Sequence, residues 1–350
     1  MFEISKQINI AMGNITIKML ARELNLSTAA ISKALRDSHE ISIVTKQRVQ
    51  ALASKLNYIP NPYAGSLRRR TSKTIAVVIP EVADSFFALS LNGIEEVAIE
   101  KGYHVLIYLT HEKVAREKAI LKDLQSGRVD GVIMSVTVET DAVQQMEDLN
   151  TNEVPLVFFD RVCEEIDTAK VTTDDYESSY KATCHLIDCG CRRIALLSVS
   201  NSLSISSKRA EGFRQAMADN KVKTNLSDII LCSNDERKNY TLIKKLLSRK
   251  QKPDGIIATV EKFTTNIYLV SQLLKINIPG DLKVVCFSNL PTAAILNPPL
   301  TTITQPAFEM GKAAATILFK ALEKRNFSIN KESIVIPSML VVRKSTVQKE

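Results

Sequence analysis

The run Leu20-Ala21-Arg22-Glu23-Leu24-Asn25-Leu26-Ser27-Thr28-Ala29-Ala30-Ile31-Ser32-Lys33-Ala34-Leu35 decides the fold of the N-terminal part of this 350-residue chain. It predicts two short helices joined by a tight turn. Thr16 is expected to cap the first helix, whose apolar residues recur at helical spacing. Asn25 tolerates the left-handed backbone of a turn, and Ser27 is expected to cap the second helix.

The second helix is predicted to have one buried face and one exposed face. Its exposed face carries small, polar and basic residues, namely Thr28, Ala29, Ser32, Lys33 and Arg36. Such groups at the front of a short helix suit a major groove about 12 Å wide. A third helix, capped by Ser42, supplies a buried stripe of Val49, Leu52, Ala53 and Leu56. Any compact three-helix domain shows these spacings, so the pattern alone leaves open whether this helix-turn-helix binds DNA.

The distribution of charge favours DNA binding. Residues 1–73 contain twelve Lys or Arg and four Asp or Glu, whereas the remaining 277 residues contain 34 of each sign. A basic N-terminal domain on a neutral remainder places the phosphate-binding surface in that domain.

Length and hydropathy predict a multidomain globular protein. A chain of 350 residues exceeds what one hydrophobic core usually serves. No apolar run approaches the roughly 18 residues of a membrane helix, and the start of the chain does not resemble a signal peptide. We therefore expect a cytoplasmic, nucleoid-associated protein with no membrane partner. Residues 1–13 have no predicted packing role.

Cysteine spacing argues against a metal site. The six cysteines all lie in the neutral part of the chain, and Cys184, Cys189 and Cys191 lie near His185. Their spacing lacks paired C-x₂-C motifs, and most of them fall within an apolar helical pattern. We expect free, mostly buried thiols, and no metal or cofactor.

Residues 58–73 are predicted to join two domains. Pro60 and Pro62 end the third helix. Asn61 can cap a very short helix reaching about Leu67, too short to be stable alone, and a run of three arginines follows from Arg68. Such a helix would fold on a template such as DNA; a plain linker is the alternative.

From Thr74 onward, apolar strands alternate with amphipathic helices. The predicted strands cover 75–79, 105–108, 131–134, 156–159, 193–197, 255–258 and 283–287. The predicted helices cover 88–101, 113–125, 141–149, 176–189, 208–220, 240–247 and 265–274. This order predicts an α/β fold of two lobes, each a parallel sheet covered by helices. A ligand is then expected in a cleft outside the carboxyl ends of the strands.

The chain resembles the LacI/GalR family of bacterial transcription regulators from Thr16 to Thr346. The resemblance is carried in the N-terminal part by Thr16-Ile17, residues 26–35, Leu56-Asn57-Tyr58-Ile59-Pro60-Asn61-Pro62 and Leu67-Arg68. In the remainder it is carried by Ile79-Pro80, Phe86-Phe87, residues 129–133, Phe159-Asp160-Arg161, residues 185–187 with Gly190 and 192–195, Arg209 with Gly212-Phe213, Ile278-Pro279 with Asp281, and Pro299-Leu300-Thr301-Thr302-Ile303 with Gln305-Pro306.

The resemblance implies a homodimeric regulator, expected to be a repressor, that binds a pseudo-palindromic operator in double-stranded DNA. The implied DNA-binding residues are Thr16, Ser27, Thr28, Ala29, Ser32, Lys33, Arg36, Asn61, Leu67 and Arg68. Thr28 and Ala29 would read bases, and Leu67 would wedge into the minor groove. Gly65 departs from the family pattern, in which arginine is common there, and this implies a looser joint. No leucine heptads follow Thr346, which favours a dimer over a tetramer.

The resemblance also implies that a small effector binds between the lobes and controls DNA affinity. The implied effector-binding residues are Phe86, Phe87, Ser135, Asp160, Arg161, Arg209, Glu261, Ser288 and Asn289. Val260-Glu261 and Ser288-Asn289 depart from the family pattern, in which aspartates are common. With fewer short carboxylates and two retained arginines, we expect an anionic or oxygen-rich sugar derivative. Core packing is the alternative for the two phenylalanines, and a structural salt bridge is the alternative for Arg209.

The implied domains are an N-terminal extension (1–14), the helix-turn-helix domain (15–57), a hinge (58–73) and an effector-binding and dimerisation domain (74–350). Within the last, lobe one would comprise about 74–170 and 304–330, and lobe two about 171–303 and 331–346.

Other classes of function fit less well. The chain contains no G-x-G-x-x-G, G-x-x-x-x-G-K-[ST] or H-E-x-x-H motif, so an enzyme such as a helix-turn-helix sugar kinase is disfavoured and no catalytic residue is assigned. A periplasmic sugar-binding protein would share the two lobes but would lack the basic domain. A regulator controlled by a phosphorylated carrier protein remains an alternative.

Overall fold

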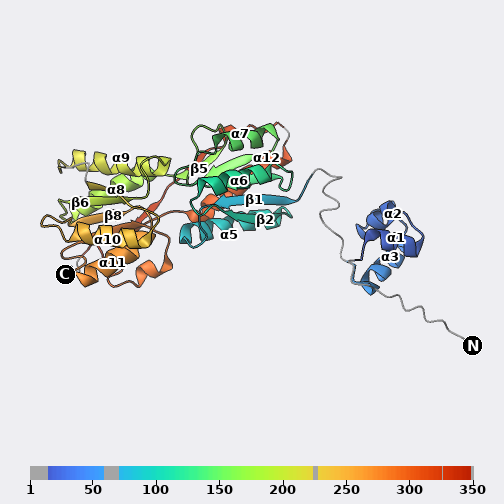
Figure 1. Cartoon of the computed structure of the whole chain (residues 1–350), viewed down its shortest axis with the longest axis horizontal. Coiled ribbons are helices and arrows are strands. Elements are labelled where there is room, and N and C mark those ends of the chain that lie inside the picture. The colour runs from blue at the N-terminus through green and yellow to red at the C-terminus, as the bar shows by residue number, and fades with distance from the viewer. Residues whose placement is uncertain (1–14, 59–70, 224–227, 325, 348–350) are drawn as a thin grey trace, which may run out of the picture. The chain divides into compact units, whose positions relative to one another are not determined.

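The computed structural model of the chain describes residues 15–58, 71–223, 228–324 and 326–347 (Figure 1). It separates into two units, residues 1–70 and 71–350. We call the first unit the head and the second the body, and each is described by itself. Most of the predicted hinge, with Asn61, Leu67 and Arg68, lies outside the described residues.

The head is a three-helix domain, as predicted. Its helices are α1 (Ile17–Leu24), α2 (Thr28–Leu35) and α3 (Ile43–Lys55). They enclose a small core in which Leu20, Ile31, Ala34 and Val49 are fully buried.

The turn and caps of the head follow the sequence signals with one exception. Asn25 has a φ of 53° and ends α1 in the left-handed conformation. Ser27 Oγ accepts the Ala30 N–H at 3.1 Å, and Ser42 Oγ accepts the Thr45 N–H at 3.3 Å. Thr16 occupies the N-cap position of α1, but its side chain makes no capping hydrogen bond. The predicted N-cap position is therefore confirmed, without a hydrogen bond from the Thr16 side chain.

Lobe one of the body is built on a parallel sheet with the strand order β11-β5-β4-β3-β1-β2. Its strands are β1 (Thr74–Ile79), β2 (His104–Leu109), β3 (Gly131–Met134), β4 (Leu156–Phe159), β5 (Lys170–Thr173) and β11 (Ile334–Ile336). Its helices are α5 (Ser85–Glu100), α6 (Val114–Leu124), α7 (Val143–Thr151) and α12 (Ala307–Glu323), with a short 3₁₀ helix η3 (Ile329–Lys331).

Lobe two has a sheet of order β12-β10-β9-β8-β6-β7, parallel except for β12, which pairs antiparallel with β10. Its strands are β6 (Ile194–Ser198), β7 (Ile229–Leu231), β8 (Gly255–Ala258), β9 (Lys283–Phe287), β10 (Thr301–Thr304) and β12 (Met339–Val341). Its helices are α8 (Asp175–Asp188), α9 (Ser204–Asp219), α10 (Glu236–Leu247) and α11 (Lys262–Leu273), with the 3₁₀ helix η2 (Pro291–Ala294). The predicted architecture of two helix-covered parallel sheets is confirmed.

The chain passes between the lobes after β5, after β10 and between β11 and β12. Residues 331–346 were predicted to belong to lobe two, but β11 pairs with β5 and so belongs to lobe one. Only β12 and the residues after it join lobe two. The short strands β11 and β12 lie only three residues apart, and the sequence pattern gave no sign that they belong to different sheets.

Glycines allow the helices in each lobe to pack closely. A Cβ at Gly311 of α12 would lie 2.0 Å from Ser90 O of α5, and a Cβ at Gly93 of α5 would lie 2.1 Å from Phe308 O. In lobe two a Cβ at Gly212 of α9 would lie 2.1 Å from Tyr176 O of α8. These close approaches fix α5 and α9, which both carry residues of the cleft.

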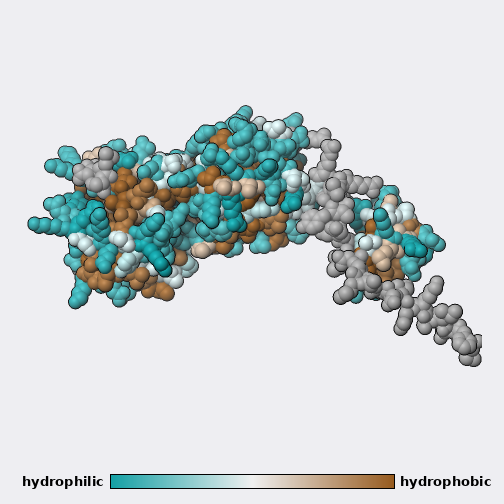
Figure 2. Space-filling model, viewed as in Figure 1, coloured by the Kyte–Doolittle hydropathy of each residue, from teal (hydrophilic) through white to brown (hydrophobic). Residues whose placement is uncertain are grey.

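Figure 2 shows hydrophilic residues covering much of the visible face of the body, with hydrophobic areas between them.

Several helices begin earlier than predicted. Helix α5 begins at Ser85 instead of Ala88, α9 at Ser204 instead of Lys208, α10 at Glu236 instead of Tyr240, and α11 at Lys262 instead of Thr265. These helices follow β1, β6, β7 and β8, so their first turns lie at the carboxyl edges of the two sheets. The missed turns of α5 and α9 carry residues that line the cavity described below.

Candidate functional site

The front of α2 presents exposed residues, as a base-reading helix requires. Thr28 and Ala29 form the first turn of α2 after the Ser27 cap, and both are exposed. A methyl group and a hydroxyl group at an uncrowded helix N-terminus can reach base edges in a groove.

Basic residues on and near α2 have partners within the head. Lys33 forms an ion pair with Glu40, and Lys46 forms one with Asp37 at 2.7 Å. Arg36 Nε donates to Ser32 O at 3.1 Å. Because Lys33 and Arg36 lie on the surface, phosphate groups could replace these contacts at small free-energy cost.

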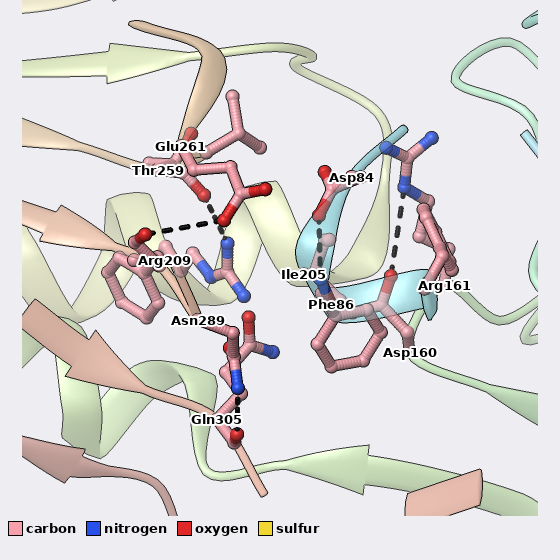
Figure 3. A pocket seen from close by; sticks show the side chains of 14 residues that line it. Asp84, Phe86, Asp160, Arg161, Ile205, Arg209, Thr259, Glu261, Asn289 and Gln305 are labelled. Atoms are coloured by element: carbon pink, nitrogen blue, oxygen red, sulfur yellow. Dashed lines mark hydrogen bonds and ion pairs between the residues drawn. The ribbon is translucent and has the colours of Figure 1, made fainter. Parts of the chain in front are cut away.

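A cavity lies between the lobes of the body, where the carboxyl edges of the two sheets face each other (Figure 3). Of the predicted effector-binding residues, all except Ser135 line it. Ser135 is fully buried at the end of β3 and does not contribute to the lining. The cavity is also lined by Asp84, Ile205, Thr259, Val260, Phe287 and Gln305, which the sequence analysis did not assign.

The lobe-one wall begins with the first turn of α5. Asp84 caps this helix, since its Oδ1 accepts the Phe86 N–H at 3.0 Å. The rings of Phe86 and Phe87 pack edge to face at 5.4 Å, and both contact Phe159 of β4. The two phenylalanines therefore serve the core and the cavity lining together, and they lie on a helix and not at a strand end.

The end of β4 supplies a carboxylate and a guanidinium to the same wall. Asp160 has a φ of 60°, a conformation that Asp and Asn tolerate better than most residues. Arg161 Nη1 donates to Glu112 at 2.7 Å, and its Nε lies 3.8 Å from Asp160. The Nε has no hydrogen-bond partner within the described part of the chain. Arg161 thus enters the cavity already neutralised by Glu112.

The lobe-two wall contains a second buried arginine. Arg209 of α9 donates through Nε to Asp175 at 2.7 Å and through Nη1 to Thr259 O at 2.6 Å. Its guanidinium also lies 4.0 Å from the centre of the Phe287 ring. Arg209 is therefore both a structural ion pair with Asp175, at the start of α8, and part of the cavity lining.

Polar residues of lobe two, and Gln305 directly after β10, complete the lining. Asn289 Nδ2 donates to Gln305 O at 2.6 Å, while its Oδ1 is buried without a hydrogen-bond partner among the described residues. Ser288 Oγ donates to Glu261 at 3.3 Å. Together with Asp84 and Asp160, these groups give the cavity more acceptor oxygens than unpaired donors.

Burial shifts the acidity of two lining carboxyls. Removal from water raises the pKa of Asp160 to about 6, against the opposing effect of the Arg161 and Arg209 charges. Burial also raises the pKa of Asp84 to about 6, and the neighbouring Glu261 charge adds to the shift. These carboxyls accept hydrogen bonds as anions near neutral pH and become hydrogen-bond donors just below it.

Other titratable clusters of the body have structural roles. His185 Nε2 lies 2.8 Å from Thr346 Oγ1 and 3.8 Å from Cys189 Sγ. Over the described ranges, no group of three or more His, Cys, Asp or Glu side chains is placed to hold a metal ion.

In the same ranges, no helix combines the length and apolar character needed to span a bilayer.

Some of the unassigned lining residues carried a usable sequence signal. Asp84 precedes Ser85-Phe86-Phe87, and an Asp before an apolar helix start is a capping signal. Gln305 directly follows the strand that precedes α12. Ile205, Thr259 and Phe287 are side chains common in any core, and their position in the lining required the structure.

Relatives and solved structures cover nearly the whole chain. Residues 72–344 match the family described as "Periplasmic binding proteins and sugar binding domain of LacI family", and residues 16–61 match "Bacterial regulatory proteins, lacI family". The "HTH-type transcriptional repressor PurR" of Photobacterium profundum is 29% identical over 337 residues, covering 94% of this chain and 98% of the relative. The "Ribose operon repressor" of Halalkalibacterium halodurans is 29% identical over 334 residues, covering 95% and 97%.

A structure of the lac repressor dimer bound to operator and the anti-inducer ONPF has the same fold. Its TM-score is 0.81 at 20% sequence identity, and the match covers 96% of this chain and 100% of that chain. At this identity the similarity supports the fold alone.

The first prediction concerns pH and Asp160→Asn. Between about pH 4 and 6, folded Asp160 keeps a proton that the unfolded chain has lost, so its contribution to the free energy of unfolding falls as pH rises through this window. Asn cannot titrate but tolerates the same backbone conformation. The wild-type free energy of unfolding, relative to that of the variant, should therefore decrease by about 2 kcal/mol between pH 4 and pH 6.

Chemical denaturation at several pH values measures this difference. Asp188→Asn, at an exposed position of α8, serves as the control. A difference between wild type and Asp160→Asn that stays constant across the window would contradict the prediction.

Proposed function

The chain belongs to the LacI family of bacterial regulatory proteins, and from this we propose that it is a homodimeric repressor whose two heads bind a pseudo-palindromic operator. A small effector in the interlobe cavity controls the operator affinity. The observation that carries this proposal is the joining, in one chain, of a basic helix-turn-helix head to a two-lobed body with a polar cavity. The same features support a regulator and not an enzyme.

The head has the chemistry for specific and non-specific DNA binding. Its excess of Lys and Arg supplies phosphate contacts, which are independent of sequence. The exposed first turn of α2 supplies Thr28 and Ala29 for base edges. Ala29 can offer only a methyl contact, for example to thymine. Selection of bound DNA from a random duplex pool should return an inverted repeat.

The second prediction separates base reading from phosphate binding. Thr28→Ala should weaken binding to the selected operator about fivefold, through loss of one hydrogen bond, and leave non-specific binding unchanged. Lys33→Ala should weaken both and lower the slope of log affinity against log salt by about 1. Fluorescence anisotropy at several salt concentrations measures both effects. Equal losses of specific and non-specific affinity in Thr28→Ala would contradict base reading by α2.

An apolar edge of lobe one supports the homodimer. Strand β2 is the edge of its sheet, yet it exposes Leu106 (38%) and Ile107 (49%), and Val82 and Leu89 are exposed as well. Exposed apolar residues on an edge strand favour association with another copy of the chain.

The third prediction places a charge on this edge. Ile107→Lys should convert the dimer to a monomer in sedimentation velocity and weaken operator binding, because the two heads no longer act together. The control is Val335→Lys, which adds the same charge to β11 at the opposite edge, where Val335 is 63% exposed. A dimer that persists in Ile107→Lys, or is lost equally in both variants, would contradict this interface.

The cavity chemistry favours a neutral, hydroxyl-rich effector such as a sugar. From the sequence we expected an anionic or oxygen-rich sugar derivative, because two arginines were retained. Each of them is already paired, Arg161 with Glu112 and Arg209 with Asp175, and the lining adds the acceptors Asp84, Asp160 and Glu261. Hydroxyl groups can donate to these carboxylates, while the Phe86 and Phe87 rings offer apolar faces to a sugar ring. The ribose operon repressor among the relatives fits this class of ligand.

The fourth prediction concerns effector class. In a thermal-shift panel, a neutral sugar should raise the melting temperature by roughly 5 °C at a hundredfold excess over its Kd. Asp160→Asn should reduce this shift, whereas Ser135→Ala, which does not line the cavity, should preserve it. Stabilisation only by purines, or only by sugar phosphates, would overturn the assignment.

A further inference from the structure

Glu261 of lobe two reaches across the cleft and binds the start of a helix in lobe one. Its Oε1 accepts the Ser85 N–H at 2.7 Å, and its Oε2 accepts the Ser85 hydroxyl at 2.5 Å. Ser85 is the first residue of α5, and Glu261 is the N-cap residue of α11. One carboxylate therefore joins the two lobes through two hydrogen bonds.

The environment of Glu261 strengthens these hydrogen bonds. The side chain is largely buried, and Ser288 Oγ donates to the same Oε2 at 3.3 Å, which fixes its position. Unsatisfied N–H groups at a helix N-terminus attract a negative charge, and hydrogen bonds to an ionised acceptor are stronger than neutral ones. When the neighbouring Asp84 carboxylate is ionised, it repels the Glu261 carboxylate and so opposes this attraction. The positive charges of Arg161 and Lys262, which lie near Asp84, offset part of this repulsion.

The size of the cavity agrees with closure by the chain itself. It measures about 30 Å³, enough for one or two water molecules and far below the roughly 300 Å³ of a typical small-molecule site. A sugar ring cannot enter a space of this size. The lobes must therefore separate before an effector binds, and the Glu261–Ser85 contact lies in the way.

We propose that Glu261 and Ser85 form an intramolecular clamp that holds the lobes closed without an effector. The strength of the clamp determines what fraction of the effector-free molecules have open lobes and can bind an effector. Its role in controlling DNA affinity rests on the function proposed above, but closure itself depends only on the body.

Two substitutions on opposite lobes break the clamp in different ways. Glu261→Ala removes the acceptor. Ser85→Pro removes both donors, and proline is well tolerated at the first residue of a helix. Asp84, which precedes it, has φ −76° and ψ 126°, a conformation compatible with a following proline. Ser85 does not line the cavity, so Ser85→Pro leaves the effector-contacting side chains in place.

The test measures the distance between lobes in the full chain, at pH 7.5, with no DNA or effector. Dyes are attached through keto amino acids at Arg116 of α6 and Lys245 of α10, which are exposed on lobes one and two. Single-molecule energy transfer should show a mainly closed wild type. Each single variant should shift the ratio of closed to open molecules about tenfold toward open, as loss of a charge-assisted hydrogen bond predicts.

The double variant distinguishes a clamp from two unrelated effects. Since both substitutions remove the same contact, Glu261→Ala combined with Ser85→Pro should be no more open than either alone. Ser85→Ala, which keeps the N–H donor, should give a smaller shift than Ser85→Pro. If Glu261→Ala does not fold, Glu261→Gln replaces it, with a smaller shift expected because the charge is lost but an acceptor remains.

Three outcomes would overturn the clamp: a wild type that is mainly open, single variants that stay closed, or effects that add in the double variant. Failure of the proposed function gives a different result, because a chain that binds neither operator nor sugar can still close through Glu261. In stopped-flow titrations with a stabilising sugar, Ser85→Pro should bind faster than wild type.

Discussion

The body depends on two buried arginines, each neutralised within its own lobe. Arg161 pairs with Glu112 in lobe one, and Arg209 pairs with Asp175 in lobe two. A buried guanidinium without a partner would destabilise the fold by several kcal/mol. Because each pair is complete inside one lobe, the lobes can separate without leaving an unpaired buried charge. The cleft can therefore open and close at a free energy set by the contacts that cross it.

The fold could be predicted from the sequence wherever one periodicity dominated. Strands such as 75–79 and 131–134 are buried on both faces and form uninterrupted apolar runs, so their positions agreed closely with the structure. The strands β5, β7, β10, β11 and β12 and the helix α12 were not predicted. The strands β7, β11 and β12 are short, lie at sheet edges and are partly exposed, with no alternation to mark them. The strands β5 and β10 are buried inside their sheets, but each has only four residues and is rich in threonine, so neither forms an apolar run. For β11 and β12 the assignment to a sheet depends on pairing across long sequence distances, which a single sequence does not reveal.

The candidate site was predictable in composition but not in its electrostatics. The family pattern pointed to Asp160, Arg161 and Arg209, which do line the cavity. It could not reveal that Glu112 and Asp175 neutralise the two arginines, because these partners lie 49 and 34 residues away along the chain. The first turns of α5, α9 and α11 were missed although each contains a buried apolar residue, such as Phe86, Ile205 and Phe263.

Those same first turns connect closure to ligand affinity. Ser85 of α5 and Glu261, which precedes α11, satisfy each other across the cleft, so the Glu261 carboxylate is occupied while the lobes are closed. An effector that enters only open molecules has an apparent affinity lower than its intrinsic affinity by the fraction that is open. A longer glutamate side chain, where aspartate is common in the family, can span the gap between lobes that a shorter carboxylate would leave. In the clamp proposed above, the departure at Glu261 would raise the effector concentration needed for half-saturation, and the paired arginines would favour a neutral effector.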